Sequence, residues 1–179
     1  AIMTTPHIGA DGISRHFGGL IAVDQVDFAV PRGEIRAIIG PNGAGKSTFV
    51  GMLCGRIPVS AGRIMFDGKD VTALPAHKRI RQGIAYTFQI TSIYGRLSLK
   101  DNVRLATSWR WGNDEQAIQN TIEESLEKVG LADRMDQMAG DLSYGHQRLL
   151  EIAMGISQHP QLLILDEPTQ GLADSEIAG

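Results

Sequence analysis

The residues from Gly40 to Thr48 have the types and spacing of a phosphate-binding loop. They are Gly-Pro-Asn-Gly-Ala-Gly-Lys-Ser-Thr, which fits the pattern of glycine, four residues and Gly-Lys-Ser/Thr. Glycines let successive N–H groups point inward, and a following helix N-terminus adds partial positive charge. Lys46 can reach the β- and γ-phosphates of a nucleotide, and the Ser47 hydroxyl can bind Mg²⁺. The alternative, a glycine-rich turn before a helix, would not require every position of the pattern to be filled.

A second candidate is the acidic pair Asp166 and Glu167, which directly follows the apolar segment Leu162 to Leu165. A carboxylate at the carboxyl end of a buried strand downstream of such a loop can hold Mg²⁺, through water or directly. The neighbouring carboxylate can orient and polarise an attacking water as a general base. Two acids can also be an ordinary strand exit, but the loop upstream favours the metal and water roles.

Three further residues can belong to the same site. Gln89 ends the apolar segment Ile84 to Phe88, and its amide oxygen can bind Mg²⁺ or the attacking water; taken alone it would be a surface glutamine. Ser143 is either a plain helix N-cap or, because Gly145 permits close backbone approach, part of a second phosphate site at a helix N-terminus. Phe17 can stack on an adenine ring or fill the core, and the sequence leaves both open.

Short strands and helices must position these residues. The apolar segment Ile35 to Ile39, ahead of the glycine loop, suits a buried parallel strand, as do the segments before Gln89 and Asp166. Residues 91–158 are expected to be mostly helical and to form a subdomain inserted between two strands. The remaining expected elements are strands at Ile8 to Phe17, Val23 to Val30 and Gly62 to Phe66, a hairpin turn at Asp67-Gly68, a short helix at Pro75 to Gln82, and helices at Asp101 to Trp109 and Asp114 to Val129. In the last helix Ile118, Ile122, Leu126 and Val129 recur at helical spacing.

The composition narrows the class of protein. The chain has 179 residues, 42% of them hydrophobic and 21% charged, which suits one domain with a substantial core. A net charge of −3 does not indicate nucleic acid or an anionic membrane as a partner. No apolar stretch could span a bilayer and no signal pattern begins the chain, so we expect any membrane association to run through a partner protein. The single cysteine, Cys54, is expected to be buried and fits a reducing cytoplasm.

Together these residues closely resemble the nucleotide-binding subunit of ABC transporters, and the match runs through the whole chain in order. Gly40 to Thr48 resembles Walker A, and Gln89 stands at the Q-loop glutamine. Leu142 to Gln147 resembles the family signature, usually Leu-Ser-Gly-Gly-Gln. Leu162 to Glu167 resembles Walker B with its catalytic glutamate, and Gly171 to Asp174 resembles the D-loop.

Within the family the chain is similar to the branched-chain amino acid importers, of which the urea importers are close relatives. The residues that carry this similarity are Phe17-Gly18-Gly19-Leu20 with Ala22-Val23, Thr87-Phe88-Gln89, Ser143-Tyr144-Gly145 and Leu150-Glu151-Ile152-Ala153. The signature is a variant, because Tyr144 replaces its first glycine and His146 stands before Gln147, while Ser143 and Gly145 remain.

The resemblance implies an α/β fold. It would have a P-loop NTPase core with a parallel sheet, an N-terminal antiparallel β subdomain and the inserted α-helical subdomain at residues 91–158. Residues 1–179 would form one nucleotide-binding domain whose C-terminal strands are missing, because the family's next strand ends in a switch-loop histidine and the chain stops at Gly179. We therefore expect a truncated domain that hydrolyses little ATP.

The resemblance also implies cofactors and residue roles. ATP and Mg²⁺ would be bound, with Glu167, Gln89 and Lys46 as catalytic residues and Ser47, Gln89 and Asp166 as Mg²⁺ ligands. The implied nucleotide contacts are Phe17, Val23, Gly40, Asn42, Gly43, Ala44, Gly45, Lys46, Ser47, Thr48, Ser143 and Gly145.

The implied partners are a second nucleotide-binding subunit, membrane permease subunits and, indirectly, a solute-binding protein, with no nucleic acid. The two subunits would pair head to tail, so that each ATP faces the other subunit's Ser143, and would lie on the cytoplasmic face of the plasma or inner membrane. The sequence leaves open whether the second subunit is identical or a paralogue. It also leaves open the solute, for which urea or another small polar molecule is the alternative to branched-chain amino acids.

Other ATPase classes match less well. DNA-repair and chromosome-structuring ATPases place a very long coiled coil between the Q-loop and the signature, whereas Gln89 and Ser143 are separated here by a short interval. A soluble, translation-associated ABC ATPase would carry two such domains in one chain. A P-loop kinase or GTPase would not need the signature.

Overall fold

The computed structural model describes residues 6–87 and 92–165 and divides into two compact units, Ala1–Gln82 and Gly83–Gly179. Each unit is described by itself. The predicted site residues Gln89, Asp166 and Glu167, and the segment Gly171 to Asp174, lie outside the described residues.

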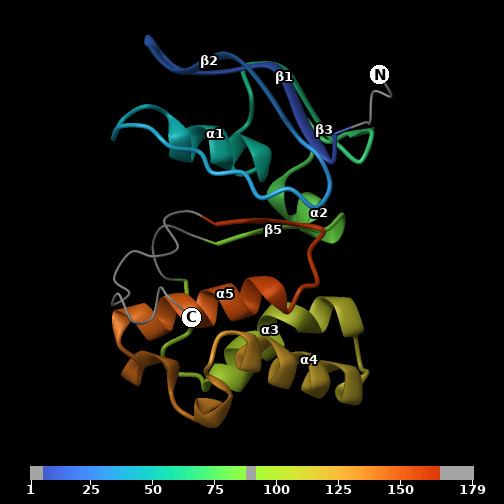
Figure 1. Ribbon diagram of the computed structural model, residues 1–179, viewed down its shortest axis with the longest axis vertical. Coiled ribbons are helices and arrows are strands. Elements are labelled where there is room, and N and C mark those ends of the chain that lie inside the picture. Colours follow the sequence, from blue (N-terminus) through green and yellow to red (C-terminus); the bar gives the residue numbers. More distant parts are fainter. Residues whose placement is uncertain (1–5, 88–91, 166–179) are drawn as a thin grey trace. The chain divides into compact units, whose positions relative to one another are not determined.

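The first unit is built on a four-stranded antiparallel sheet of order β2-β1-β3-β4 (Figure 1). Its strands are β1 (Ile8–Phe17), β2 (Leu20–Val30), β3 (Ala61–Phe66) and β4 (Lys69–Asp70). Asp67 and Gly68 both have positive φ, 48° and 74°, between the paired residues Phe66 and Lys69, so the predicted hairpin turn is confirmed. The predicted strands at Ile8 to Phe17, Val23 to Val30 and Gly62 to Phe66 are confirmed as well, with β2 and β3 each starting earlier than expected.

Two helices complete the first unit. Helix α1 (Lys46–Leu53) follows the glycine loop and packs on β2 (Figure 1). Between them the rings of Phe49 and Phe28 meet edge to face, with their centroids 5.2 Å apart. Helix α2 (Ala76–Arg81) carries the buried Arg79, whose guanidinium donates to the carbonyls of Met52 and Leu53 at 2.7–2.8 Å. Both carbonyls lie at the end of α1, and the Met52 carbonyl also accepts from the Gly55 N–H at 3.1 Å, so the buried cation adds donors to the bonds that end this helix.

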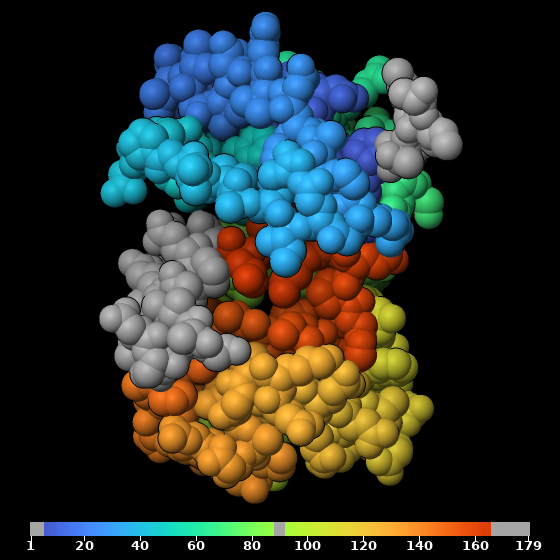
Figure 2. All heavy atoms as spheres, in the orientation of Figure 1, coloured from blue at the N-terminus to red at the C-terminus, as the bar shows by residue number. Residues whose placement is uncertain are grey.

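The predicted strand at Ile35 to Ile39 is wrong for the described structure. This segment has no assigned strand, and Ile35 and Ile39 are 99% and 91% exposed. In Figure 2 the atoms of residues 31–45, light blue to cyan, are visible at the surface of the first unit. A strand needs a neighbour that pairs with its N–H and C=O groups, and no strand of the four-stranded sheet pairs with this segment.

The second unit contains a parallel pair of strands, β5 (Ile84–Tyr86) and β6 (Leu162–Ile164). Ile84 pairs with Leu162 and Tyr86 with Ile164, and the Thr87 N–H extends the ladder to the carbonyl of Ile164 at 3.0 Å. Both predicted strands are therefore confirmed as neighbours in a parallel sheet. Their carboxyl ends lie at the same sheet edge, which is where α/β folds bind ligands.

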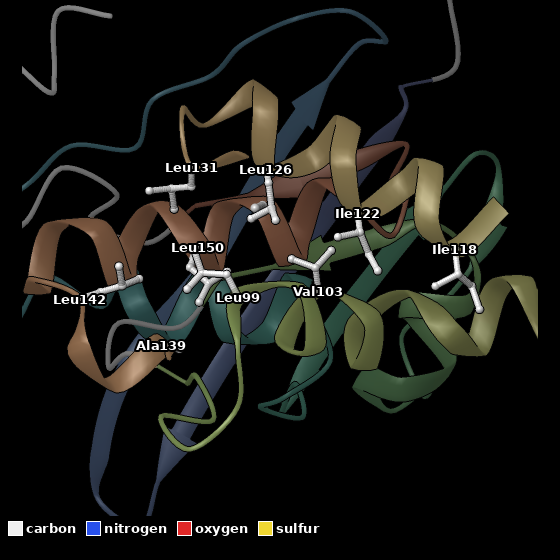
Figure 3. Packing of buried hydrophobic residues seen from close by; sticks show 10 residues of the cluster. Leu99, Val103, Ile118, Ile122, Leu126, Leu131, Ala139, Leu142 and Leu150 are labelled. Atoms are coloured by element: carbon white, nitrogen blue, oxygen red, sulfur yellow. The ribbon is translucent and has the colours of Figure 1, made fainter. Parts of the chain in front are cut away.

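Three helices form the rest of the second unit: α3 (Leu99–Trp111), α4 (Glu115–Lys128) and α5 (Tyr144–Ile156). Short 3-10 turns, η1 (Ala132–Arg134) and η2 (Ala139–Asp141), connect α4 to α5. Helix α5 lies between the strand pair and the α3–α4 pair (Figure 1). Side chains from all three helices meet in one apolar cluster (Figure 3), which comprises Leu99, Val103, Ile118, Ile122, Leu126, Leu131, Ala139, Leu142, Leu150 and Ala153.

The helical spacing of Ile118, Ile122 and Leu126 is confirmed, because all three are at most 2% exposed and point into this cluster (Figure 3). Helix α3 begins earlier than predicted. Ser98 provides the reason: its hydroxyl caps the helix by accepting from the Asp101 N–H.

Candidate functional site

The backbone of the glycine loop requires glycine at Gly45. This residue precedes α1 with φ +81°, a conformation that side-chain-bearing residues rarely adopt. A Cβ placed on it would lie 2.2 Å from the carbonyl oxygen of Ala22 in β2. Gly43 has the same φ of +81°, but a Cβ there would meet nothing within 4 Å. The loop is thus held against β2 at Gly45 and open at Gly43.

The start of α1 offers unpaired backbone donors. Within the described residues, no hydrogen bond engages the N–H groups of residues 45–48. The first turn of α1 contains no acidic residue and has no side-chain cap. Unpaired N–H groups and the positive end of the helix dipole together favour an anion at this position.

Lys46 adds a full positive charge to the loop. Its Nζ donates to the carbonyls of Gly40 at 2.6 Å and Pro41 at 2.8 Å, and the Ala44 N–H closes the loop onto the same Pro41 carbonyl at 3.2 Å. An ammonium group has three N–H donors, so one remains for a ligand. The donors of this loop, ammonium and backbone amide alike, fit the oxygens of a phosphate chain.

A pocket of about 560 Å³ adjoins the loop in the first unit. It is lined by residues of β2, by Arg36 to Ile39 and by the start of α1, and it includes Val23, Gly45 and Lys46. Its volume lies within the range of small-molecule sites. The structure thus brings the predicted contact residue Val23 next to the glycine loop.

Phe17 lies at the surface, where it is 44% exposed at the end of β1. The guanidinium of Arg15 lies 4.5 Å from the centroid of its ring. The alternative of a core phenylalanine is therefore excluded. Phe17 is not among the residues that line the pocket.

Ser143 and Gly145 lie at the start of α5 in the second unit. Ser143 is the N-cap: its Oγ accepts from the His146 N–H at 3.4 Å and lies 2.6 Å from Nδ1 of the same histidine. Gly145 is buried, whereas Ser143 and Tyr144 are exposed. The predicted N-cap is confirmed, and the imidazole contact is an addition that the sequence did not indicate.

A buried ion pair supports this helix start. Arg148 and Glu151, 2% and 6% exposed, form a 2.8 Å contact within α5. Glu151 also accepts from the backbone N–H of Ser92, so α5 is hydrogen-bonded to the segment that begins at residue 92. Sequence reasoning missed this pair, for which the only signal was opposite charge at a spacing of three residues on a helix.

Of the predicted Mg²⁺ ligands, only Ser47 lies within the described residues, where it is exposed in the first turn of α1. Gln89 and Asp166 would follow β5 and β6, whose ends adjoin in the parallel pair. Glu167, the residue predicted to act as general base, also lies outside the described part of the chain. Among the described residues, none of the helices combines the length and apolar character needed to cross a membrane.

Comparison with known proteins identifies the family. The sequence profile described as ABC transporter matches residues 23–170. The chain belongs to the ABC transporter family. The ATP-binding cassettes of this family are ATPases that power transport, so the enzyme class and the ATP-binding function expected from the sequence are confirmed.

Individual relatives carry different transport names. The chain is 34% identical over 188 residues to the high-affinity branched-chain amino acid transport ATP-binding protein BraF of Pseudomonas aeruginosa, covering 97% of this chain and 74% of BraF. It is 36% identical over 163 residues to the lipopolysaccharide export system ATP-binding protein LptB of Escherichia coli, covering 91% of this chain and 68% of LptB. The predicted similarity to branched-chain amino acid importers is confirmed, and the solute is not settled by it.

Solved structures confirm the fold class. MJ1267, an ATP-binding cassette of an ABC transporter, matches with a TM-score of 0.87 at 28% identity, covering 98% of this chain and 74% of that chain. The crystal structure of its ADP conformation matches with a TM-score of 0.84 at 27% identity and the same two coverages. The α/β architecture, with an antiparallel β unit and parallel strands packed by helices, is that of an ABC cassette.

Proposed function

We propose that this chain binds MgATP at Gly40 to Thr48 and hydrolyses it to ADP and phosphate as the ATP-binding subunit of an importer. The observation that carries the proposal is the loop itself. Gly45 lies against β2 in a conformation that favours glycine, and the adjoining start of α1 carries the Lys46 ammonium and backbone N–H groups without a side-chain cap. The proposal treats residues 1–179 as part of one cassette with its helical subdomain at 91–158.

In this proposal the loop holds the phosphate chain and neutralises charge that develops on the γ-phosphoryl group. Lys46 and the N–H groups of residues 45–48 donate to phosphate oxygens, and Glu167 orients the water that attacks the γ-phosphorus. The bond between the γ-phosphorus and the oxygen bridging to the β-phosphate breaks, and ADP leaves. Ser47, Gln89 and Asp166 would hold Mg²⁺, which would supply further charge neutralisation. Phe17 and Val23 receive the adenine base.

The site is completed by a second subunit, identical or paralogous, paired head to tail. Its Ser143 hydroxyl and the N-terminus of its α5 face the γ-phosphate of the ATP on the first subunit's loop. ABC ATP-binding subunits work with membrane permease components, and we assign this chain a peripheral place on the cytoplasmic face of the membrane through such permeases. A solute-binding protein would deliver the solute.

For the solute we favour branched-chain amino acids. The match to BraF covers almost the whole chain, and the sequence resemblance to branched-chain importers runs through several segments. A second candidate, export of a lipopolysaccharide-like glycolipid, is supported by the 36% identity to LptB. Uptake of labelled leucine, urea and ribose in cells lacking the gene distinguishes the importer solutes. Accumulation of glycolipid in the inner membrane of these cells would instead favour the export candidate.

The ATPase mechanism is tested with Glu167→Gln in the natural full-length protein. We expect this variant to bind MgATP as the unmodified protein does, to lose nearly all turnover and to accumulate as a closed dimer, because only the group that orients water has changed. Lys46→Ala should instead lose MgATP binding, and Lys78→Ala, on the exposed face of α2, is the matched control. Normal turnover by Glu167→Gln would remove this glutamate from its role.

A further inference from the structure

We propose that His146 is a positioning residue for Ser143: its imidazole donates to the Ser143 hydroxyl oxygen and thereby turns the hydroxyl hydrogen toward the phosphate. The inference rests on the proposed function, in which Ser143 contacts the ATP bound by a second subunit. His146 directly precedes Gln147 in the signature segment, at a place where the family pattern has no histidine.

The geometry is local and well defined. Nδ1 of His146 lies 2.6 Å from Ser143 Oγ, and the His146 backbone N–H points to the same oxygen at 3.4 Å. Ser143 is exposed, so its hydroxyl is accessible to a ligand, and the imidazole of His146 is half-buried beside it.

The number of donors and acceptors determines the direction of each bond. A serine hydroxyl has one hydrogen to donate and two lone pairs to accept with. The terminal phosphate oxygens of ATP at neutral pH are acceptors, so Ser143 can bind them only by donating its single hydrogen. That hydrogen is then not available to the imidazole. His146 must therefore donate from Nδ1, and the two N–H groups of His146 occupy both lone pairs of Ser143 Oγ.

The side chain at position 146 is not required for the cap itself. The N-cap bond uses the backbone N–H of His146, which every residue other than proline provides. The imidazole adds a second donor to the same oxygen. Without that donor the hydroxyl rotates among its staggered orientations, and fewer of them point to the phosphate.

The effect is expected in kcat. His146→Leu removes one neutral hydrogen bond from the pair, which corresponds to a decrease in kcat of roughly 3- to 10-fold. Ser143→Ala removes a bond to a charged group and should lower kcat roughly 10- to 100-fold. KM for MgATP should change little, because the phosphate chain is held mainly by the other subunit's loop.

The test is a double-mutant cycle on the natural full-length protein, comparing His146→Leu, Ser143→Ala and both changes together by steady-state ATP hydrolysis. If His146 acts through Ser143, the double variant is no slower than Ser143→Ala alone. His146→Gln should recover part of the rate, because an amide N–H can donate to the same oxygen. His77→Leu, at an exposed histidine of α2, is the matched control, and melting temperatures verify folding; should His146→Leu not fold, His146→Ala carries the same comparison.

Two results would overturn the inference and spare the proposed function. One is an unchanged kcat for His146→Leu while Ser143→Ala is slow, and the other is additive loss in the double variant. An unchanged kcat for Ser143→Ala would instead contradict the composite site of the proposed function, and the role of His146 with it.

Discussion

Substitution of Gly45 by alanine examines the contact between the loop and β2 most directly. The alanine would keep the φ of +81°, which costs an L-residue roughly 1–2 kcal/mol. Its Cβ would also lie 2.2 Å from the Ala22 carbonyl oxygen, and both sides of this contact are backbone. Relief requires that the loop and β2 move apart, which corresponds to overpacking at about 1–3 kcal/mol. Together these give a loss of about 2–5 kcal/mol in the free energy of local unfolding.

Gly43→Ala is the matched control, because Gly43 has the same φ but an open space around its Cβ position. It should lose only the conformational term of roughly 1–2 kcal/mol. The difference between the two variants therefore measures the close approach of Gly45 to Ala22 and nothing else in the loop.

Hydrogen exchange of the β2 and α1 amides, measured without nucleotide, gives the local free energy for the first unit. We expect faster exchange in Gly45→Ala than in Gly43→Ala by a factor of roughly 5 or more, and weaker MgATP binding by calorimetry. Equal exchange in the two variants would show that the Ala22 contact does not hold the loop, and the reasoning from the 2.2 Å approach would be refuted.

Two further predictions concern the described core of the first unit. Arg79→Met should cost about 3–5 kcal/mol in the same exchange measurement, because it removes the guanidinium donors from carbonyls at the end of α1 and at Thr72 and Leu74. Lys78→Met should change it by less than about 0.5 kcal/mol, and comparable losses would contradict the role of the buried guanidinium. Burial raises the pKa of the Cys54 thiol, which is 4% exposed, so iodoacetamide at pH about 8 should alkylate it at least roughly 100-fold more slowly in the folded protein than in urea. Similar rates by timed mass spectrometry would show that the thiol is accessible.

Local signals in the sequence were sufficient for much of the fold. Asp67-Gly68 predicted a tight hairpin because both residues tolerate positive φ, and both have it. Ile118, Ile122 and Leu126 predicted the buried face of α4, since helical spacing places them on one side. Ser143 predicted a helix start, because a capping bond involves only residues within one turn of the helix.

Other features depended on contacts between residues far apart in the chain. The apolar run Ile35 to Ile39 predicted a strand, but pairing requires a neighbouring strand that the run cannot specify. The sequence left Phe17 open between core and surface, and only the packed sheet placed it outside. Nothing in the sequence around Arg79 indicated burial, whereas the folded chain buries its guanidinium against carbonyls of α1.

For the candidate site, the sequence alone was sufficient to predict a phosphate-binding loop at Gly40 to Thr48, because the donors of this loop come from consecutive residues and their geometry is local. Only the tertiary structure decided why Gly45 must be glycine, since the Ala22 carbonyl that would meet its Cβ comes from β2. Residue types and their spacing specify the chemistry that a segment can perform. The close approach of two distant backbone segments is determined by how the folded sheet and helix pack.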